Sequence, residues 1–564
     1  MKNNSKILFI TIFIASGLMR VYGINWDHGF HMHPDERAII LFTNQLSFPK
    51  TVADFFNPNS TWNPHFFAYG SLPLYMLYFV GKLIAIFKPE YFSYDYLTII
   101  GRAISLFADL GILSLVFFIG RRLWNNKVGA LAAFFYGISV LPIQLSRFYA
   151  VDTLLSFFIL LTLYLLIRFY ENPSLKLSLL IGASLAASLS TKISATVLIV
   201  SFLFALSIDF LLIIKKSPHP KSWIAHVPSF LKKLILYFLA TGAMTVLLFF
   251  VFQPYVLIAF PEFWQQTLAQ AQMTKNAFTF PYTLQYVGKI PYIYELTQVF
   301  FVGMGPILAL TCFFGIIKRA IDIKTKKAGL FKKQELILLI FFLSYFLIVG
   351  KFAVGFIRYI LPLYPILCLF GGLVSYQIFI KLKSPKMVLA CIFLIGVLTW
   401  PISFMSIYTK PFTRYEASIW ITKNIPSSST IAVEHWDDSL PLFNASDYQY
   451  ETLALYEPDS PLKWSIIASS LQKSDYLILS SSRLYKPLSK LIDCQNLPKG
   501  RCYKETAKYY DDLFKGKLGY KKVAEFSSFA TIPFTTLELN DQNLDESFSV
   551  YDHPVVTIFK NMNK

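Results

Sequence analysis

Long apolar runs without charged residues recur over the first 408 residues and limit what this 564-residue chain can fold into. An α-helix needs about 20 apolar residues to cross the hydrocarbon core of a bilayer. Hydropathy predicts eleven apolar spans, at 7–24, 98–119, 128–146, 153–171, 177–191, 193–214, 234–252, 297–317, 335–350, 359–380 and 387–408. The sequence therefore predicts a polytopic α-helical membrane protein.

Basic residues raise the net charge to +19, but they gather in the segments between the apolar spans. Such clusters typically lie on the cytoplasmic side of a membrane, so their placement argues against a nucleic-acid-binding protein. They are Arg121, Arg122, Lys127, Lys215, Lys216, Lys221, Lys232, Lys233, Lys318, Arg319, Lys324, Lys326, Lys327, Lys332, Lys333, Lys381, Lys383 and Lys386.

A twelfth apolar segment, 71–87, decides the topology, because a crossing there would reverse the side of every later loop. With the N-terminus in the cytoplasm, that crossing would export all of the basic clusters. The positive-inside tendency therefore predicts that 71–87, with Tyr75, Tyr78 and Phe87, lies along the membrane surface as an interfacial helix. The expected arrangement is about eleven transmembrane helices, with the N-terminus inside and the C-terminus outside.

The same topology places a small set of ionisable residues on the outer face, away from the basic loops. These residues are Asp35, Glu36, Arg147, Asp152, Lys192, Lys351 and Arg358. Each of the cations alone is equally well explained as an anchor at the membrane interface. Their gathering on one face with three acids instead favours a functional site.

The segment His31-Met-His-Pro-Asp-Glu-Arg37 carries five ionisable side chains soon after the first span. Pro34 suits the first turn of a helix, which places Asp35 and Glu36 where the helix dipole stabilises carboxylates. A carboxylate held in this way can accept a proton from a substrate hydroxyl. The competing interpretation is that these acids only cap the start of a helix.

Three further motifs bring charge to the same face. Ser146-Arg147 is followed by Asp152 at a turn between two spans, an arrangement suited to binding an anion and orienting a polar acceptor. Thr191-Lys192 places an ammonium group at the level of lipid phosphate head groups. Arg358-Tyr359 adds a guanidinium, whose planar fork suits phosphate.

Together, His33-Pro34-Asp35-Glu36, Ser146-Arg147 with Asp152, Thr191-Lys192 and Arg358-Tyr359 with Pro362 resemble the motifs of the GT-C glycosyltransferases. The resemblance is closest to protein O-mannosyltransferases and lipid A aminoarabinose transferases, and it covers residues 7–408. It implies a GT-C fold, a polyprenyl-phosphate-linked sugar as the donor and no nucleotide pocket. An acid of the first outer loop lies at the active site in that family, and it corresponds to Asp35. The resemblance also implies a multi-pass protein of the cell (plasma) membrane with an extracytoplasmic active site.

Glycosyl transfer from a lipid phosphate needs a base for the acceptor hydroxyl and cations for the leaving phosphate. We predict Asp35 as the base, Glu36 as a second catalytic acid, and Asp152 and His33 as support for the acceptor or for a metal ion. The predicted phosphate ligands are Arg147, Lys192 and Arg358. A base and a cationic clamp on opposite sides of the sugar predict inversion. A divalent cation suits these side chains, but the sequence does not require one.

Residues 409–564 are polar, and helix and strand patterns alternate along them. The patterns predict a helix at 413–424 and strands near 431–435, 476–480, 522–526 and 555–559. We therefore expect a GT-C transmembrane glycosyltransferase domain, 1–408, and an extracytoplasmic α/β domain, 409–564. In the second domain, Cys494 and Cys502 are predicted to form a disulfide. The polar cluster Glu434-His-Trp-Asp-Asp438 is most simply a strand end with a solvated turn.

The competing function is a transporter or flippase of lipid-linked sugars that performs no covalent chemistry. Such proteins show internal repeats and broken helices with sites at the membrane midplane. The sequence shows no repeat, and its ionisable residues gather at one face. It therefore favours transfer to a hydroxyl of a protein, lipid or glycan, without revealing which sugar moves.

Overall fold

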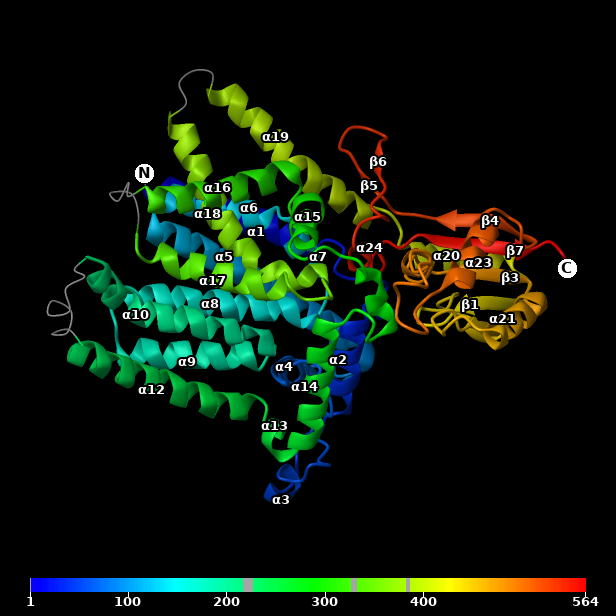
Figure 1. Ribbon diagram of the computed structural model, residues 1–564, viewed down its shortest axis with the longest axis horizontal. Helices are drawn as coiled ribbons and strands as arrows, with labels where there is room; N and C mark the ends of the chain where they lie inside the picture. The colour runs from blue at the N-terminus through cyan, green and yellow to red at the C-terminus, as the bar shows by residue number, and fades with distance from the viewer. Residues whose placement is uncertain (1, 217–226, 326–331, 382–385) are drawn as a thin grey trace.

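Every predicted span coincides with one helix or with two or three consecutive helices of a bundle, on the left of Figure 1. The computed structural model describes residues 2–216, 227–325, 332–381 and 386–564. The helices of the bundle are α1 (Lys2–Val21), α5 (Tyr94–Leu123), α6 (Asn126–Gly137), α7 (Val140–Leu145), α8 (Val151–Glu171), α9 (Leu175–Leu189), η2 (Ile193–Val197), α10 (Leu198–Lys216), α12 (Val227–Phe252), α15 (Ile293–Gln298), η4 (Val299–Gly303), α16 (Pro306–Lys324), α17 (Glu335–Val349), η6 (Ile357–Leu363), α18 (Tyr364–Lys381) and α19 (Lys386–Met405).

By length and composition alone, five helical segments among the described residues can cross a membrane. They are Tyr94–Leu123, Val151–Glu171, Ile235–Phe252, Ile357–Ile380 and Met387–Asn424. Several other bundle helices are apolar but shorter, because a break or a 3₁₀ turn interrupts the span. Pro142, for example, cannot donate a helical hydrogen bond, so α7 starts afresh with this residue in its first turn. The 3₁₀ helices η2 and η6 similarly precede α10 and α18, and these turns position Lys192 and Arg358.

The two ends of the bundle carry different residues. Figure 1 places the N-terminus at the end far from the C-terminal sheet, and Asn126, after α5, donates a hydrogen bond to Ser5 at this end. Arg121 and Arg122, in the last turn of α5, therefore lie at the end of the bundle that holds the N-terminus of the chain. Helix α2 (Pro34–Gln45), which carries Asp35 in its first turn, lies toward the sheet in Figure 1, at the other end of the bundle. Four of the predicted basic loop residues, Lys221, Lys326, Lys327 and Lys383, lie outside the described residues.

The segment 71–87 forms helix α4 (Leu72–Ala85), which lies across the bundle and not along it. Figure 1 shows α4 almost end-on, while α8, α9 and α12 run across the view. α4 packs against α2 (Pro34–Gln45) and α5. This packing buries Tyr75 and Tyr78, so Phe87 is the only one of the three predicted interfacial aromatics that is exposed. The other short elements at this end are α3 (Val52–Phe55), η1 (Pro89–Tyr91), α13 (Tyr255–Ile258), α14 (Phe260–Lys275) and η3 (Pro281–Tyr286).

The C-terminal region contains a five-stranded sheet in the order β2-β1-β3-β7-β4, on the right of Figure 1. β1 runs parallel to β2 and β3, whereas β7 runs antiparallel between β3 and β4. The strands are β1 (Thr430–Glu434), β2 (Gln449–Leu453), β3 (Tyr476–Leu479), β4 (Tyr520–Phe526), β5 (Ala530–Thr531), β6 (Glu538–Leu539) and β7 (Val556–Asn561). The helices are η7 (Ser406–Thr409), α20 (Thr413–Asn424), η8 (Ala445–Asp447), α21 (Pro461–Lys473), α22 (Tyr485–Leu488), α23 (Lys504–Phe514) and α24 (Glu546–Ser549). The predicted helix and all four predicted strands are therefore present.

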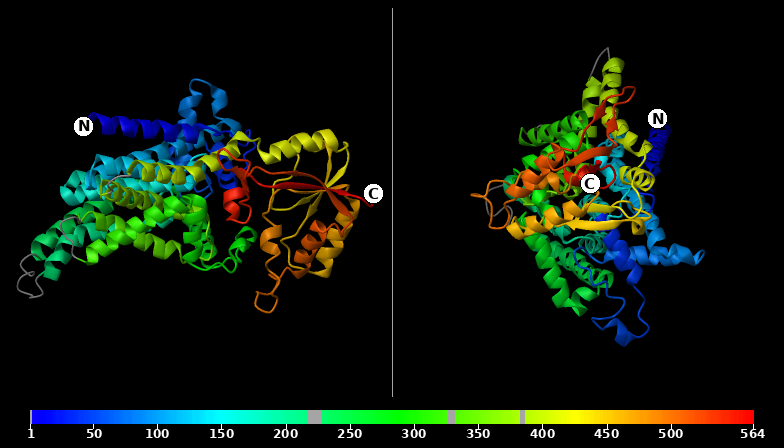
Figure 2. Two further views of the ribbon diagram at one scale, coloured as in Figure 1. Left: turned by 90° about the horizontal axis from the view of Figure 1, so that it is seen from above. Right: turned by 90° about the vertical axis from the view of Figure 1, so that its right-hand side faces the viewer.

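Alternation along the strands gives this sheet two apolar faces. Ile431 and Val433 of β1 pack in one cluster with Ile421 of α20. Ala432, between them, points to the other face and packs with residues of α21 and α23, such as Ile467. The sheet is therefore covered by helices on both faces, and Figure 2 shows these layers from two further directions.

Cys494 and Cys502 form the predicted disulfide. The chain-entropy model assigns so short a loop a stabilisation of roughly 2.5 kcal/mol. We expect Cys502→Ser to lower the free energy of unfolding of the C-terminal domain by about that amount. Thiol counting is the direct check: of five cysteines, three are free, so unfolded protein without reductant should react with three equivalents of maleimide. Five reactive thiols in that sample would contradict the bridge.

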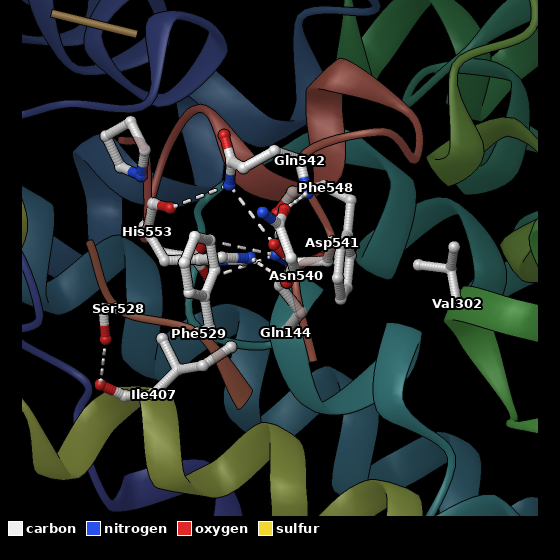
Figure 3. Close-up of polar contacts among 12 residues, drawn as sticks. Gln144, Val302, Ile407, Ser528, Phe529, Asn540, Asp541, Gln542, Phe548 and His553 are labelled. Atoms are coloured by element: carbon white, nitrogen blue, oxygen red, sulfur yellow. Dashed lines mark hydrogen bonds and ion pairs between the residues drawn. The ribbon is translucent and has the colours of Figure 1, made fainter. Parts of the chain in front are cut away.

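The C-terminal region also reaches back to the bundle through residues 541–553, here called the docking arm. Gln144 of α7 donates a hydrogen bond from Nε2 to the carbonyl of Phe548 at 2.7 Å, drawn in Figure 3, and another to Asp552 at 3.1 Å. Phe548, Val550 and Tyr551 belong to the same apolar cluster as the bundle helices. The two predicted sequence regions therefore share a core across the predicted boundary.

Three buried ionisable side chains, Asp541, Asp552 and His553, form an ion cluster within the docking arm. His553 Nε2 lies 2.9 Å from Asp541 Oδ2, and His553 Nδ1 lies 2.6 Å from Asp552 Oδ1. Burial alone would lower the pKa of His553, but the two carboxylates outweigh it and raise the pKa to about 10. The imidazolium is therefore charged at neutral pH and holds both carboxylates, while Asp552 also accepts a hydrogen bond from Tyr408 beside α19.

Candidate active site

Asp35 lies in the first turn of α2, as the sequence predicts. Pro34 is the first residue of this helix, and the N-cap residue His33 accepts the backbone N–H of Glu36 at Nδ1, at 3.4 Å. Successive side chains on a helix point about 100° apart. The two acids of the motif therefore face different surroundings.

Four of the predicted site residues form one chain of ion pairs. Arg358 Nη2 lies 2.9 Å from Asp35 Oδ2, and Arg358 Nε lies 3.4 Å from Asp152 Oδ2. Lys192 Nζ lies 2.8 Å from Asp152 Oδ1. These residues come from α2, η6, α8 and the turn before η2, so the tertiary fold brings together side chains that are far apart in the sequence.

Two atoms of this chain lack hydrogen-bond partners. Asp152 Oδ2 and Arg358 Nε are buried and contact each other as an ion pair, but neither makes a hydrogen bond within the described part of the chain. Buried polar atoms without a hydrogen bond often mark places where a ligand binds or a reaction occurs. Aromatic rings support both cations: Lys192 Nζ lies 4.3 Å from the ring centroid of Tyr359, and the Arg358 guanidinium lies 4.2 Å from that of Phe356.

The electrostatic surroundings keep Asp35 ionised. Burial alone would raise the pKa of Asp35, but the surrounding groups, led by the guanidinium of Arg358 and including a hydrogen bond from Tyr69, together outweigh burial and lower it. The pKa of His33, in contrast, falls to about 3, chiefly because burial disfavours the charged imidazole. At neutral pH the site therefore contains a carboxylate, a guanidinium and a neutral imidazole.

A cavity of about 310 Å³ lies beside Lys192. The turn around η2, the end of α12, α14 and α17 bound this cavity, and its wall includes Tyr69, Lys192, Tyr345 and Tyr359. Most of the remaining lining is apolar. An apolar cavity next to cations suits an amphiphilic ligand with an anionic head group and a hydrocarbon tail.

Glu36 takes part in a different ion cluster. Arg102 of α5 lies between two carboxylates, with Nη2 at 2.7 Å from both Glu36 Oε1 and Asp27 Oδ2, and all three side chains are fully buried. The backbone N–H of Tyr149 also donates to Glu36, at 2.8 Å. Burial raises the pKa of Glu36, and Arg102 only partly offsets that rise. The structure thus places Glu36 against Arg102, away from the ion pair of Asp35.

Arg147 also lies apart from the other predicted phosphate ligands. Its guanidinium is fully buried and donates to the backbone carbonyls of Met19, Tyr22 and Ile143. It also stacks on Tyr408, 4.0 Å from the ring centroid. The structure therefore brings Lys192 and Arg358 together but uses the donors of Arg147 to join α1 to the α7–α8 turn.

His33 has contacts that suit packing more than metal binding. Its ring lies 4.6 Å from that of Phe148 and 4.3 Å from that of Tyr551, centroid to centroid. Within the described ranges, no group of three or more His, Cys, Asp or Glu side chains is arranged to hold a metal ion.

Three tyrosines near Asp35 were not predicted as site residues. Tyr69 lines the cavity, and the pKa of Tyr282 is raised first by burial and then by the Asp35 carboxylate. Tyr551 comes from the docking arm, more than 500 residues after Asp35 in the sequence. No local pattern marks these tyrosines, because the sequence contains 33 tyrosines and only the fold selects among them.

Comparison with known proteins finds one family match, over part of the chain. Residues 98–254 match the family model described as dolichyl-phosphate-mannose-protein mannosyltransferase. No curated protein sequence matches the chain. The apo structure of the Archaeoglobus fulgidus oligosaccharyltransferase aligns at 10% identity with a TM-score of 0.50, over 98% of this chain and 88% of that chain.

Two further structures align less closely. ArnT from Cupriavidus metallidurans, bound to undecaprenyl phosphate, aligns at 12% identity with a TM-score of 0.44, over 85% of this chain and 94% of that chain. The S. cerevisiae protein O-mannosyltransferase Pmt1-Pmt2 complex, bound to the sugar donor, aligns at 16% identity with a TM-score of 0.31, over 46% of this chain and 34% of that chain.

The helical bundle, its sheet domain and the family match define a multi-pass membrane glycosyltransferase with a GT-C-like fold that uses a polyprenyl-phosphate sugar donor. Residues 98–254 of the chain are similar to the dolichyl-phosphate-mannose-protein mannosyltransferase family. This confirms the family resemblance drawn from the sequence motifs.

Proposed function

We propose that the protein transfers a sugar from a polyprenyl phosphate to a hydroxyl acceptor at the outer face of the cell membrane, with inversion. The observation that carries this proposal is the chain of ion pairs from Asp35 through Arg358 and Asp152 to Lys192, beside an apolar cavity. The cavity takes the first part of the prenyl tail. Lys192 and Arg358 hold the phosphate, and Asp35 faces the sugar.

In this mechanism Asp35 takes the proton of the acceptor hydroxyl as the new bond to the anomeric carbon forms. The bond from the anomeric carbon to the phosphate oxygen breaks, and the polyprenyl phosphate leaves with the electron pair. Its growing negative charge is stabilised by Lys192 and Arg358. A phosphate bound to Arg358 also competes with Asp35 for the guanidinium, and the weaker pairing returns the pKa of Asp35 toward its ordinary value. Donor binding thereby makes Asp35 a stronger base.

A genetic experiment tests the function and identifies the sugar. Deletion of the gene should cause the lipid-linked sugar that serves as the donor to accumulate, because its consumer is missing. Mass spectrometry of extracted polyprenyl-phosphate sugars measures this accumulation. An unchanged pool, with no change in any glycosylated product, would contradict the proposal.

The phosphate clamp gives a direct prediction for binding. Lys192→Ala and Arg358→Ala should each weaken binding of polyprenyl phosphate by about 10–100-fold, because each removes a charge-assisted contact. Purified protein in lipid nanodiscs and radiolabelled polyprenyl phosphate provide the measurement. Lys351→Ala is the matched control, because Lys351 is an exposed cation of the same face. Equal affinity in all three variants would show that the clamp is misassigned.

The proposed topology keeps α4 on the outer surface, with the N-terminus inside and the C-terminal domain outside. In a Cys391→Ser background, a cysteine at Phe87, before α5, should react with an impermeant maleimide in intact cells. A cysteine at Arg121, at the other end of α5, should react only after permeabilisation. Both positions are exposed in the structure. The reverse pattern would show that α4 crosses the bilayer.

A further inference from the structure

The ion pair of Asp35 and Arg358 has a second neighbour besides the cavity. Tyr551 of the docking arm lies against His33 and does not line the cavity. Burial raises the pKa of Tyr551 to about 12, so its hydroxyl keeps a proton at neutral pH and can donate a hydrogen bond. If the donor phosphate occupies the Lys192 side, inversion requires the acceptor to attack from the opposite face of the sugar. The residues around Tyr551 are therefore the surroundings of the acceptor.

Trp436 is the largest exposed aromatic side chain near this face. It follows β1, its side chain is 51% exposed, and its backbone φ is +68°. A bulky residue in the left-handed region is strained, and such strain persists where the surrounding structure imposes it, often at binding sites. Arg483 Nη1 donates to the Trp436 carbonyl at 3.2 Å and holds this conformation. The centroid of the indole ring lies 6.4 Å from that of the Tyr282 ring. Tyr282 in turn lies near Asp35, whose carboxylate contributes to raising the pKa of Tyr282 after burial.

Charged groups with unused hydrogen-bonding capacity lie beside these rings. The Arg483 guanidinium is 5.7 Å from the ring centroid of Tyr551, and its Nε is 3.0 Å from Glu546 Oε1. The other carboxyl oxygen, Glu546 Oε2, is buried and has no hydrogen-bond partner among residues 2–216, 227–325, 332–381 and 386–564. A guanidinium paired with a half-satisfied carboxyl can bind neighbouring hydroxyl groups, which both donate and accept.

We propose that this face, formed by Trp436, Tyr282, Tyr551, Arg483 and Glu546, binds a saccharide as the acceptor. A pyranose ring presents C–H groups on its flat face and hydroxyls at its edge. The flat face stacks on Trp436 and Tyr282, and the hydroxyls reach Arg483, Glu546 and Tyr551 while one of them approaches Asp35. The inference names the acceptor class of the proposed transfer reaction and rests on that proposal.

Binding without the lipid donor tests the saccharide site independently of the chemistry. The probes are a panel of fluorescent alkyl mono- and disaccharides and a Ser/Thr-rich peptide, titrated into the full-length protein in nanodiscs. We expect at least one glycoside to bind, and Trp436→Ala to weaken that binding by about 10–30-fold, as loss of a central Trp anchor typically does. Trp436→Phe, which keeps a flat ring, should recover part of the affinity.

Phe534→Ala is the matched control. Phe534 is also an exposed aromatic residue of the C-terminal region with a positive φ, 62°, but it lies between β5 and β6. This variant should bind the glycoside as the wild type does. Binding of the peptide alone, binding of no glycoside in the panel, or equal loss in Trp436→Ala and Phe534→Ala would each overturn the saccharide site.

Transfer assays separate a failure of this inference from a failure of the proposed function. Tyr551→Phe removes one hydroxyl and should lower kcat/KM for the saccharide acceptor by about 2–10-fold, with donor affinity unchanged. Glycoside binding that depends on Trp436, without transfer from any lipid-phosphate sugar, would refute the proposed reaction and retain the saccharide site. Transfer to the peptide at the same rate in the wild type, Trp436→Ala and Tyr551→Phe would support the proposed reaction and refute the saccharide site.

Discussion

Asp35→Asn should lower the rate of sugar transfer by about 10²–10⁴-fold, which is the usual contribution of a positioned general base. The amide is nearly isosteric with the carboxylate and leaves Pro34 and the His33 cap in place, so α2 should still form. The measurement is transfer from a polyprenyl-phosphate sugar by purified protein in detergent. Donor affinity should not fall, because Lys192 and Arg358 remain and Arg358 is freed from a competing carboxylate.

Glu36→Gln is the comparison for this experiment. Glu36 contacts Arg102 and the backbone of Tyr149, so its loss should reduce the yield of folded protein more than the turnover of each folded molecule. Near-normal turnover in Asp35→Asn together with loss in Glu36→Gln would move the base to Glu36. Full turnover in both variants would remove the carboxylate mechanism.

Arg102→Met should destabilise the protein by about 3–5 kcal/mol, because it leaves two buried carboxylates, Asp27 and Glu36, without their counterion. Thermal unfolding can be followed with a thiol-reactive dye, since the buried cysteines Cys312 and Cys368 become reactive only when the bundle opens. The variant should unfold at a clearly lower temperature than the wild type.

Arg121→Met is the control for this effect, because Arg121 belongs to the same helix and is exposed. Substitutions at such surface positions usually change stability by less than about 0.5 kcal/mol. If Arg102→Met and Arg121→Met unfold at the same temperature, the cluster of Asp27, Glu36 and Arg102 does not stabilise the segment between α1 and α5.

The sequence alone predicts the elements of this protein well. Each apolar span forms one helix or two to three consecutive helices, because an apolar run of that length leaves a backbone few other ways to satisfy its hydrogen bonds in a bilayer. The helix at 413–424 and the strands of the sheet follow from local periodicity in the same way. The bridge of Cys494 and Cys502 was predictable because only eight positions separate the two residues.

The sequence also identified the chemical types at the site, but it could not decide which of them meet. Arg147, Lys192 and Arg358 look alike as cations on one face, yet only Lys192 and Arg358 lie on the ion-pair chain. Arg147 donates hydrogen bonds to backbone carbonyls instead, because α7 and the end of α1 both pack beside its guanidinium. Which ionic side chains contact each other depends on how helices far apart in the sequence pack together, and a local sequence pattern carries no information about that packing.

For the neighbouring acids Asp35 and Glu36, too, the sequence could not predict which partner each side chain has. Asp35 and Glu36 share a helical turn, and only the position of Arg102 on α5 determines that Glu36 is the one turned inward. Tyr551 lies at the other extreme, because it reaches His33 from the far end of the chain through the docking arm. Local sequence therefore determined the helices, the strands and the kinds of side chain at this site. Long-range packing decided which charges pair, because a buried charge without a counterion is costly and the counterions come from distant parts of the chain.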